Sequence, residues 1–225
     1  MTTPATDVQV APSAFAGSRI LTWRWPWLYE ALFRLSPTSQ RVRASEIAEV
    51  LARIDEVGHP GQVVVEVGCG PGTYTRLLAS RFAHVTALDA ASEMVAYTIA
   101  RTARDGHRNV AGAYGRLPND LHAVSGADGV VAVGVLDFAD DLVEWMRALR
   151  GYVAPGGWVV FTVPASHTAP RVAGIVEGFL SGRAFTRDAN AVRAAVASAG
   201  LRCRRVAAVE HRGRCYTLVV SAVRP

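Results

Sequence analysis

The segment Val63–Thr73, VVVEVGCGPGT, decides how the rest of the chain is interpreted. It opens with a short, mostly β-branched apolar run, which is typical of a buried strand. Gly68, Gly70 and Gly72 follow at alternate positions. Glycines after a first strand let the backbone pass close to a ligand, and the next helix directs free N–H groups at that ligand. The segment therefore predicts a nucleotide-binding turn.

Strand and helix patterns alternate on both sides of this turn. Such alternation predicts an α/β fold with a doubly wound, mostly parallel sheet. Two strand patterns flank His211-Arg212-Gly213 and predict a hairpin, so the last strand should run antiparallel. A helix is expected to start at Thr186 and stop at Gly200. The expected strands are 62–67, 84–89, 109–114, 129–136, 158–165, 201–211 and 214–223, and the other expected helices are 39–57, 72–82, 92–104 and 140–153.

Composition bounds the class of protein. The chain has 225 residues, half of them hydrophobic, which fits one large domain with or without a small accessory piece. It has no apolar run of about 20 residues and no secretory signal pattern, so neither a spanning helix nor export is expected. The three cysteines, Cys69, Cys203 and Cys215, favour a reducing cytoplasm. Their spacing with His211 matches no zinc-finger pattern, so no metal is expected.

The net charge of +5 reflects an excess of arginine, because lysine is absent. Most arginines are dispersed, which does not favour nucleic acid as a partner. One cluster near the end fits a solvated hairpin surface, or alternatively a surface that contacts phosphates. Its members are Arg202, Arg204, Arg205, Arg212 and Arg214.

Two acids beside the turn indicate which nucleotide it holds. The glycine spacing is G-x-G-x-G, with Thr73 where a dinucleotide pattern would have its third glycine. Asp89 ends the second expected strand, where a carboxylate can accept hydrogen bonds from both hydroxyls of a ribose. Glu66, at the mouth of the turn, would repel a pyrophosphate and attract a cationic ligand. S-adenosylmethionine (SAM) carries an α-ammonium beside a sulfonium and is the predicted cofactor.

Four segments together resemble successive motifs of class I SAM-dependent methyltransferases, in the branch that acts on small molecules. They are VVVEVGCGPGTYT, VTALDAASEMV, ADGVVAVGVLDFADD and VAPGGWVVFTVP. The resemblance covers residues 60–225. It implies a seven-stranded sheet in the order 3-2-1-4-5-7-6 with strand 7 antiparallel. It also implies a helical lid before the sheet.

The resemblance assigns cofactor contacts position by position. Glu66 should face the methionine ammonium, the three glycines should pass beneath the methionine and ribose, and Asp89 should hold the ribose hydroxyls. Where the family often has an acid that binds the adenine amino group, this chain has Ala113, so only backbone contact is expected there. The remaining expected contacts are Ala90 and Met94 on adenine, with plain core packing as their alternative, Tyr114 near the ring, and Ala132 and Val133 on the methionine side.

The acceptor side is less defined by the sequence. Asp137 and Phe138 follow the fourth expected strand, and Phe138 is a candidate substrate contact. Asp137 could bind a cationic substrate or take a proton, or it could merely begin the next helix. His167, after the fifth strand, is a candidate base or an exposed loop histidine. No Asp-Asn pair follows that strand, which disfavours a magnesium-assisted site.

The N-terminal part divides into an expected disordered tail, residues 1–12, and an expected lid segment, residues 13–58, before the SAM-binding domain at 59–225. Trp23, Trp25 and Trp27 are candidate substrate walls, and Tyr29 resembles a tyrosine that reaches the cofactor from such lids. Core packing and a membrane-surface anchor are the alternatives for this segment.

Three functions fit the sequence. The first is methyl transfer to the nitrogen, oxygen or carbon atom of a small molecule, in specialised metabolism. The others are a SAM-binding regulatory or partner subunit, and a SAM enzyme of other chemistry such as cyclisation.

Overall fold

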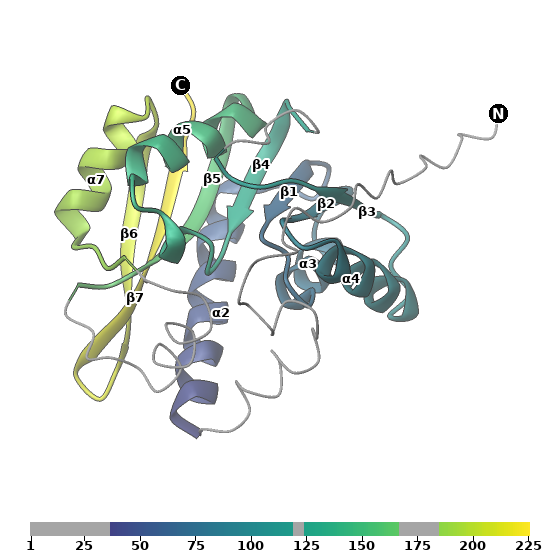
Figure 1. Cartoon of the computed structure of the whole chain (residues 1–225), viewed down its shortest axis with the longest axis horizontal. Helices are drawn as coiled ribbons and strands as arrows, with labels where there is room; N and C mark the ends of the chain where they lie inside the picture. Colours follow the sequence, from purple (N-terminus) through teal and green to yellow (C-terminus); the bar gives the residue numbers. More distant parts are fainter. Residues whose placement is uncertain (1–36, 119–123, 167–184) are drawn as a thin grey trace.

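The computed structural model describes residues 37–118, 124–166 and 185–225, which form a sheet covered by helices (Figure 1). The strands are β1 Val63–Val67, β2 His84–Asp89, β3 Val110–Tyr114, β4 Ala127–Ala132, β5 Val153–Pro164, β6 Arg202–His211 and β7 Arg214–Val223. Within the described ranges these seven strands form one sheet in the order β3-β2-β1-β4-β5-β7-β6. β7 pairs antiparallel with β5 and β6, and the other pairs are parallel. The predicted sheet, strand order and antiparallel last strand are confirmed.

Helices cover both faces of this sheet. One face carries α2 Pro37–Val57, α3 Thr73–Ala79 and α4 Ser92–Arg104, and the other carries α5 Leu142–Tyr152 and α7 Ala189–Ser198. In Figure 1, α2 passes behind the strands while α5 and α7 lie in front. Successive strand residues point to opposite faces, so Val64 packs on the α2 side and Val65 on the α5 side. Burial on both faces explains why these strands are continuous apolar runs.

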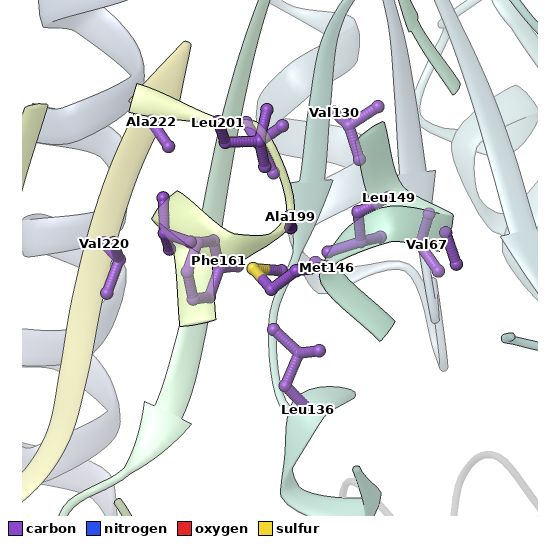
Figure 2. Close-up of a cluster of buried hydrophobic side chains, with 14 of the residues drawn as sticks. Val67, Val130, Leu136, Met146, Leu149, Phe161, Ala199, Leu201, Val220 and Ala222 are labelled. Atoms are coloured by element: carbon purple, nitrogen blue, oxygen red, sulfur yellow. The ribbon is translucent and has the colours of Figure 1, made fainter. Parts of the chain in front are cut away.

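The core on the α5 side fixes the strands from which the site's loops leave. Figure 2 shows Met146 and Leu149 of α5 among side chains of the sheet, which include Val67 and Phe161. All four side chains are buried. Burying a side chain of this size stabilises a fold by about 1.5–3 kcal/mol. This buried cluster therefore holds the ends of β1 and β4 in place.

The start of the last helix was predicted wrongly. Asp188, not Thr186, caps α7, because Asp188 Oδ1 accepts hydrogen bonds of 2.8 Å from the amides of Asn190 and Ala191. Both Asp and Thr are favourable cap residues, so the sequence alone did not distinguish them.

The start of β5 also differs from the expected residue 158. The strand begins at Val153 and includes Pro155-Gly156-Gly157, a sequence that is typical of turns. The amide of Gly156 donates to the carbonyl of Arg224, and the amide of Arg224 donates to the carbonyl of Gly157, both at 2.9 Å. This long-range pairing with the end of the chain draws the segment into the sheet.

α2 packs on the sheet as part of the core. Val42, Val50 and Ile54 are buried in it, in one cluster with residues of β1, β5 and β7. The part of the expected lid segment from Pro37 onward is therefore a sheet-packing helix. The expected tail and residues 13–36 lie outside the described residues. No helix in the described ranges is long and apolar enough to cross a membrane.

Candidate active site

The glycine turn between β1 and α3 has three residues in left-handed conformations. The φ angles of Gly68, Gly70 and Gly72 are 73°, 50° and 82°. A Cβ added to Gly68 would lie 2.2 Å from Val135 Cγ2, and one on Gly72 would lie 2.9 Å from Thr98. A Cβ on Gly70 would meet no atom of the described residues within 4 Å. The turn is thus packed tightly at its two ends and open at its centre, as close approach of a ligand requires.

Asp89, at the end of β2, holds this turn in place. Its Oδ2 accepts a hydrogen bond from the amide of Gly70, and its Oδ1 accepts one from the amide of Ala91, both at 2.9 Å. Burial raises the pKa of the Asp89 carboxyl above its ordinary value, although the amide hydrogen bonds act in the opposite direction. Each carboxylate oxygen keeps a further lone pair, so Asp89 can still accept bonds from two hydroxyl groups.

α4 supports the turn from the other side. Thr98 Oγ1 donates to the carbonyl of Gly70 at 2.6 Å, and Arg101 Nη1 donates to the carbonyl of Pro71 at 3.1 Å. Sequence reasoning missed both residues, because their distance along the chain from the turn gives no local signal. Together with Asp89, they fix the backbone of the turn from one helix, α4, and one strand, β2.

Glu66 lies beneath the turn and is almost fully buried, with 3% of its surface exposed. Thr75 Oγ1 donates to Glu66 Oε2 at 2.5 Å. Burial raises the pKa of Glu66 from 4.5 to about 8, and the neighbouring Asp89 carboxylate also raises it, whereas the Thr75 hydrogen bond lowers it. A buried carboxyl with a displaced pKa beside a ligand-binding turn is a feature of functional sites.

The first half of α2 contacts the start of α3, next to the glycine turn. Arg43 Nη2 donates to Thr73 Oγ1 at 3.1 Å, and the hydroxyl of Tyr74 donates to Glu46 Oε1 at 3.4 Å. Burial, together with the Glu46 carboxylate, raises the pKa of Tyr74, which keeps its hydroxyl protonated. These contacts attach α2 to the first turn of α3, directly after Gly72.

The other predicted cofactor residues surround the ends of the first four strands. Ala113 and Tyr114 pair with Leu88 and Asp89, so the end of β3 lies beside the ribose candidate. The other predicted cofactor contacts differ in solvent exposure. Their contacts with the cofactor remain predictions. Ala90 and Val133 are half-buried, Met94 is 3% exposed, and Ala132 is fully buried in the core.

Asp137 and Phe138 lie in a single 3-10 turn, η2 Leu136–Phe138, directly beyond β4. The alternative that Asp137 begins the next helix is wrong, because Asp141 caps α5 by accepting from the amides of Val143 and Glu144. The side chain of Asp137 therefore has no capping role in α5.

Residues 185–187 brace this turn. The amide of Phe185 donates to the carbonyl of Asp137 at 2.8 Å. Arg187 Nη2 donates to the carbonyls of Ala139 and Asp140 at 2.9 and 3.2 Å. These bonds hold the η2 turn in place. The candidates His167, Trp23, Trp25, Trp27 and Tyr29 lie outside the described residues.

A family of methyltransferase domains matches residues 65–159, from the middle of β1 to β5. The match includes the glycine turn, Asp89 and the η2 turn, and the strand order of the sheet agrees with the fold of that family. The chain contains a class I methyltransferase domain. This confirms the family that the four motifs resembled.

Proteins similar in sequence to this methyltransferase domain are also methyltransferases by name. A trans-aconitate 2-methyltransferase of Streptomyces avermitilis is 33% identical over 138 residues, which cover 57% of this chain and 48% of the relative. A probable trans-aconitate 2-methyltransferase of Mycobacterium tuberculosis is 34% identical over 118 residues, which cover 50% of this chain and 41% of the relative. The matched region thus spans about half the length of these relatives.

Solved structures share the fold of the methyltransferase domain at low identity. Magnesium protoporphyrin IX methyltransferase from Synechocystis PCC 6803, with bound S-adenosylhomocysteine (SAH), has a TM-score of 0.71 at 17% identity and covers 92% of this chain and 96% of its own. A [4+2]-cyclase has a TM-score of 0.63 at 16% identity and covers 82% of this chain and 80% of its own. The same fold therefore occurs in proteins named for different reactions.

Within the ranges that the structure describes, no group of three or more His, Cys, Asp or Glu side chains could hold a metal ion. Cys69, Cys203 and Cys215 are free thiols.

Proposed function

We propose that the chain binds SAM and transfers its methyl group to a small-molecule acceptor. The observation that carries this proposal is the placement of Asp89 and Glu66, on the adjacent strands β2 and β1, next to a turn that is open at Gly70. This arrangement fits the cofactor. Asp89 has lone pairs for two ribose hydroxyls, and Glu66 supplies a carboxyl group that the methionine ammonium would ionise and pair with. The open space at Gly70 matches the close passage of the ligand over the backbone.

The bound cofactor would supply an electrophilic methyl group on its sulfonium. The chain's own contribution is to hold and orient the reactants, because much of the rate of methyl transfer comes from alignment of nucleophile, methyl and sulfur. Asp137 and Phe138 stand at the end of β4 next to the turn, so we assign them to the acceptor side. Asp137 would bind a cationic acceptor or take a proton from it. His167 remains a second candidate base.

The names of the relatives specify trans-aconitate, so this acid is the first acceptor to test, and a cationic acceptor, which would suit Asp137 better than a polyanion, is the second. The [4+2]-cyclase neighbour supports one competing function, in which the cofactor is bound without methyl transfer. Incubation with methyl-labelled SAM and either trans-aconitate or a metabolite extract distinguishes the two. Label in a product supports the methyltransferase, and a converted product without label supports the competing function. SAM binding without turnover of any compound would indicate a regulatory subunit.

Partners and location are proposed on the same basis. A small molecule is the expected partner, and the exposed arginines of β6 fit a solvated edge better than a nucleic-acid site. Membrane-surface contact through the tryptophans stays the alternative for the N-terminal segment. The free thiols agree with a reducing cytoplasm. The sequence after β5 has no Asp-Asn pair, which favours transfer without a magnesium ion.

Replacing Asp89 by Ala is expected to weaken SAH binding without unfolding the protein. Loss of charge-assisted hydrogen bonds to the ribose should lower the affinity by about 10- to 150-fold. Calorimetric titration of both proteins with SAH measures the difference, and thermal melting checks the fold. Equal dissociation constants would remove Asp89 from the ribose site.

Deletion of residues 1–36 tests the proposed lid. α2 starts at Pro37, and Arg43 in its first half contacts Thr73 at the start of α3, so the deletion leaves α2 and this contact in the chain. The truncated protein should still bind SAH, but methyl transfer should fall much further than affinity, because a lid excludes water and aligns the acceptor. A lower melting temperature as the main effect would favour core packing. Loss of liposome binding with full turnover would favour the membrane anchor.

A further inference from the structure

A buried carboxyl group and a guanidinium flank the first turn of α3. On one side, Thr75 donates to the buried Glu66 carboxyl at 2.5 Å. On the other side, Arg43 of α2 donates to Thr73 Oγ1 at 3.1 Å. Thr73 directly follows Gly72, and Thr75 comes two residues later. An acid and a guanidinium are thus placed around the same short stretch of backbone at the end of the glycine turn.

An α-amino acid group carries two charges close together, an ammonium and a carboxylate. A site that pairs the ammonium with Glu66 leaves the carboxylate to be paired with a cation nearby. Guanidinium groups suit this purpose, because their planar N–H donors match the geometry of a carboxylate. Arg43 is half-buried, so its side chain is constrained by its surroundings yet still accessible.

We propose that Arg43 binds the carboxylate of the cofactor's methionine part, with Thr73 orienting the guanidinium. This inference rests on the proposed function. It gives α2 a second role, because the helix that packs on the sheet also supplies a ligand to the cofactor. It also explains why a charged side chain, rather than an apolar one, extends from α2 to the start of α3.

A merely structural role for Arg43 makes a different prediction. If Arg43 only attaches α2 to α3, its loss should disturb the turn and weaken every ligand that binds there. If it pairs with the carboxylate, its loss should weaken only ligands that carry one. Decarboxylated SAM keeps the ammonium, sulfonium and adenosine but lacks the carboxylate. The comparison of SAM with decarboxylated SAM therefore isolates the proposed contact.

The experiment measures the dissociation constants of both compounds for the full chain and for Arg43→Gln. SAM affinity should fall about 10- to 100-fold in the variant, the range expected for a charge-assisted hydrogen bond. Affinity for decarboxylated SAM should be unchanged, and Arg43→Lys should recover part of the loss for SAM.

Two arginines serve as matched controls. Arg101→Gln removes a guanidinium that also bonds to the turn, through the carbonyl of Pro71, and should weaken both compounds by the same factor. Arg41→Gln removes an exposed charge two residues before Arg43 and should change neither affinity.

The outcomes separate the inference from the function on which it rests. Wild-type protein that binds neither compound would overturn the proposed function. Wild-type protein that binds SAM, together with equal losses for both compounds in Arg43→Gln, would overturn the inference alone. If Arg43→Gln shows no cooperative melting transition, Arg43→Lys provides the test. The ratio of its dissociation constants for SAM and decarboxylated SAM is then compared with that of the wild type, and an unchanged ratio contradicts the proposal.

Discussion

Replacing Gly70 by Val is expected to abolish cofactor binding while leaving a folded protein. The added side chain would occupy the open space at the centre of the turn, where the ligand has to pass. SAH should then fail to bind even at about 1 mM, which corresponds to a binding free energy weaker than about −4 kcal/mol. Calorimetric titration and thermal melting of the variant provide the measurement.

Gly106→Val is the matched control for this prediction. Gly106 also has a positive φ, 91°, and a Cβ there would meet no atom of the described residues within 4 Å, but Gly106 follows the far end of α4. Both variants carry the backbone cost of a branched residue in the left-handed region, about 1–2 kcal/mol. Only Gly70→Val should lose the ligand. Retained SAH affinity in folded Gly70→Val would place the cofactor elsewhere.

Replacing Glu66 by Gln should make the protein more stable at alkaline pH. The pKa of Glu66 is 4.5 in the ordinary case and about 8 in the folded protein, so the folded state keeps a proton that the unfolded state releases. The resulting stability is fully present below pH 4.5 and is lost as the pH rises through about 8. Gln cannot ionise and avoids this loss, which amounts to several kcal/mol. Melting temperatures of both proteins from pH 5 to 9 should therefore diverge, with the variant higher at pH 9.

The same substitution should have the opposite effect on the cofactor. An ammonium beside Glu66 favours the ionised carboxylate, so binding releases a proton and the SAM affinity of the wild type should rise from pH 6 to 8. Glu66→Gln should bind SAM more weakly and show a smaller pH dependence. Parallel melting curves and parallel affinity profiles would show that Glu66 does not titrate in this range. If the prediction holds, Glu66 lowers the free energy of unfolding at alkaline pH and at the same time strengthens the binding of SAM.

The sheet could be predicted from the sequence because its signals are local. The apolar runs of β1 and β2 and the Gly68–Gly72 spacing each lie within a few residues. β2 and α4 were predicted with their observed bounds. The start of β5 was missed because its pairing partner, Arg224, lies at the other end of the chain. A Pro-Gly-Gly segment favours a turn unless such a partner is known.

The residues of the site likewise fall into those that the local sequence indicates and those that only tertiary contacts bring to the site. Glu66 and Asp89 were recognisable because each stands at a fixed place relative to a strand and the turn. Arg43, Thr75 and Thr98 were not, since they act across helix contacts that the fold creates. An arginine or threonine within a helix resembles any solvated or packed residue until the tertiary structure places it.

The bonding of the glycine turn has a kinetic consequence. Asp89 and Thr98 hold Gly70 through its amide and its carbonyl, and the amides of Gly68 and Cys69 donate to the carbonyl of Leu88. The turn therefore has its final shape before a ligand arrives, and association requires no ordering of this backbone. A transferase must exchange spent for fresh cofactor in every cycle. Because the turn is already ordered, this exchange does not require its backbone to order and disorder in each cycle.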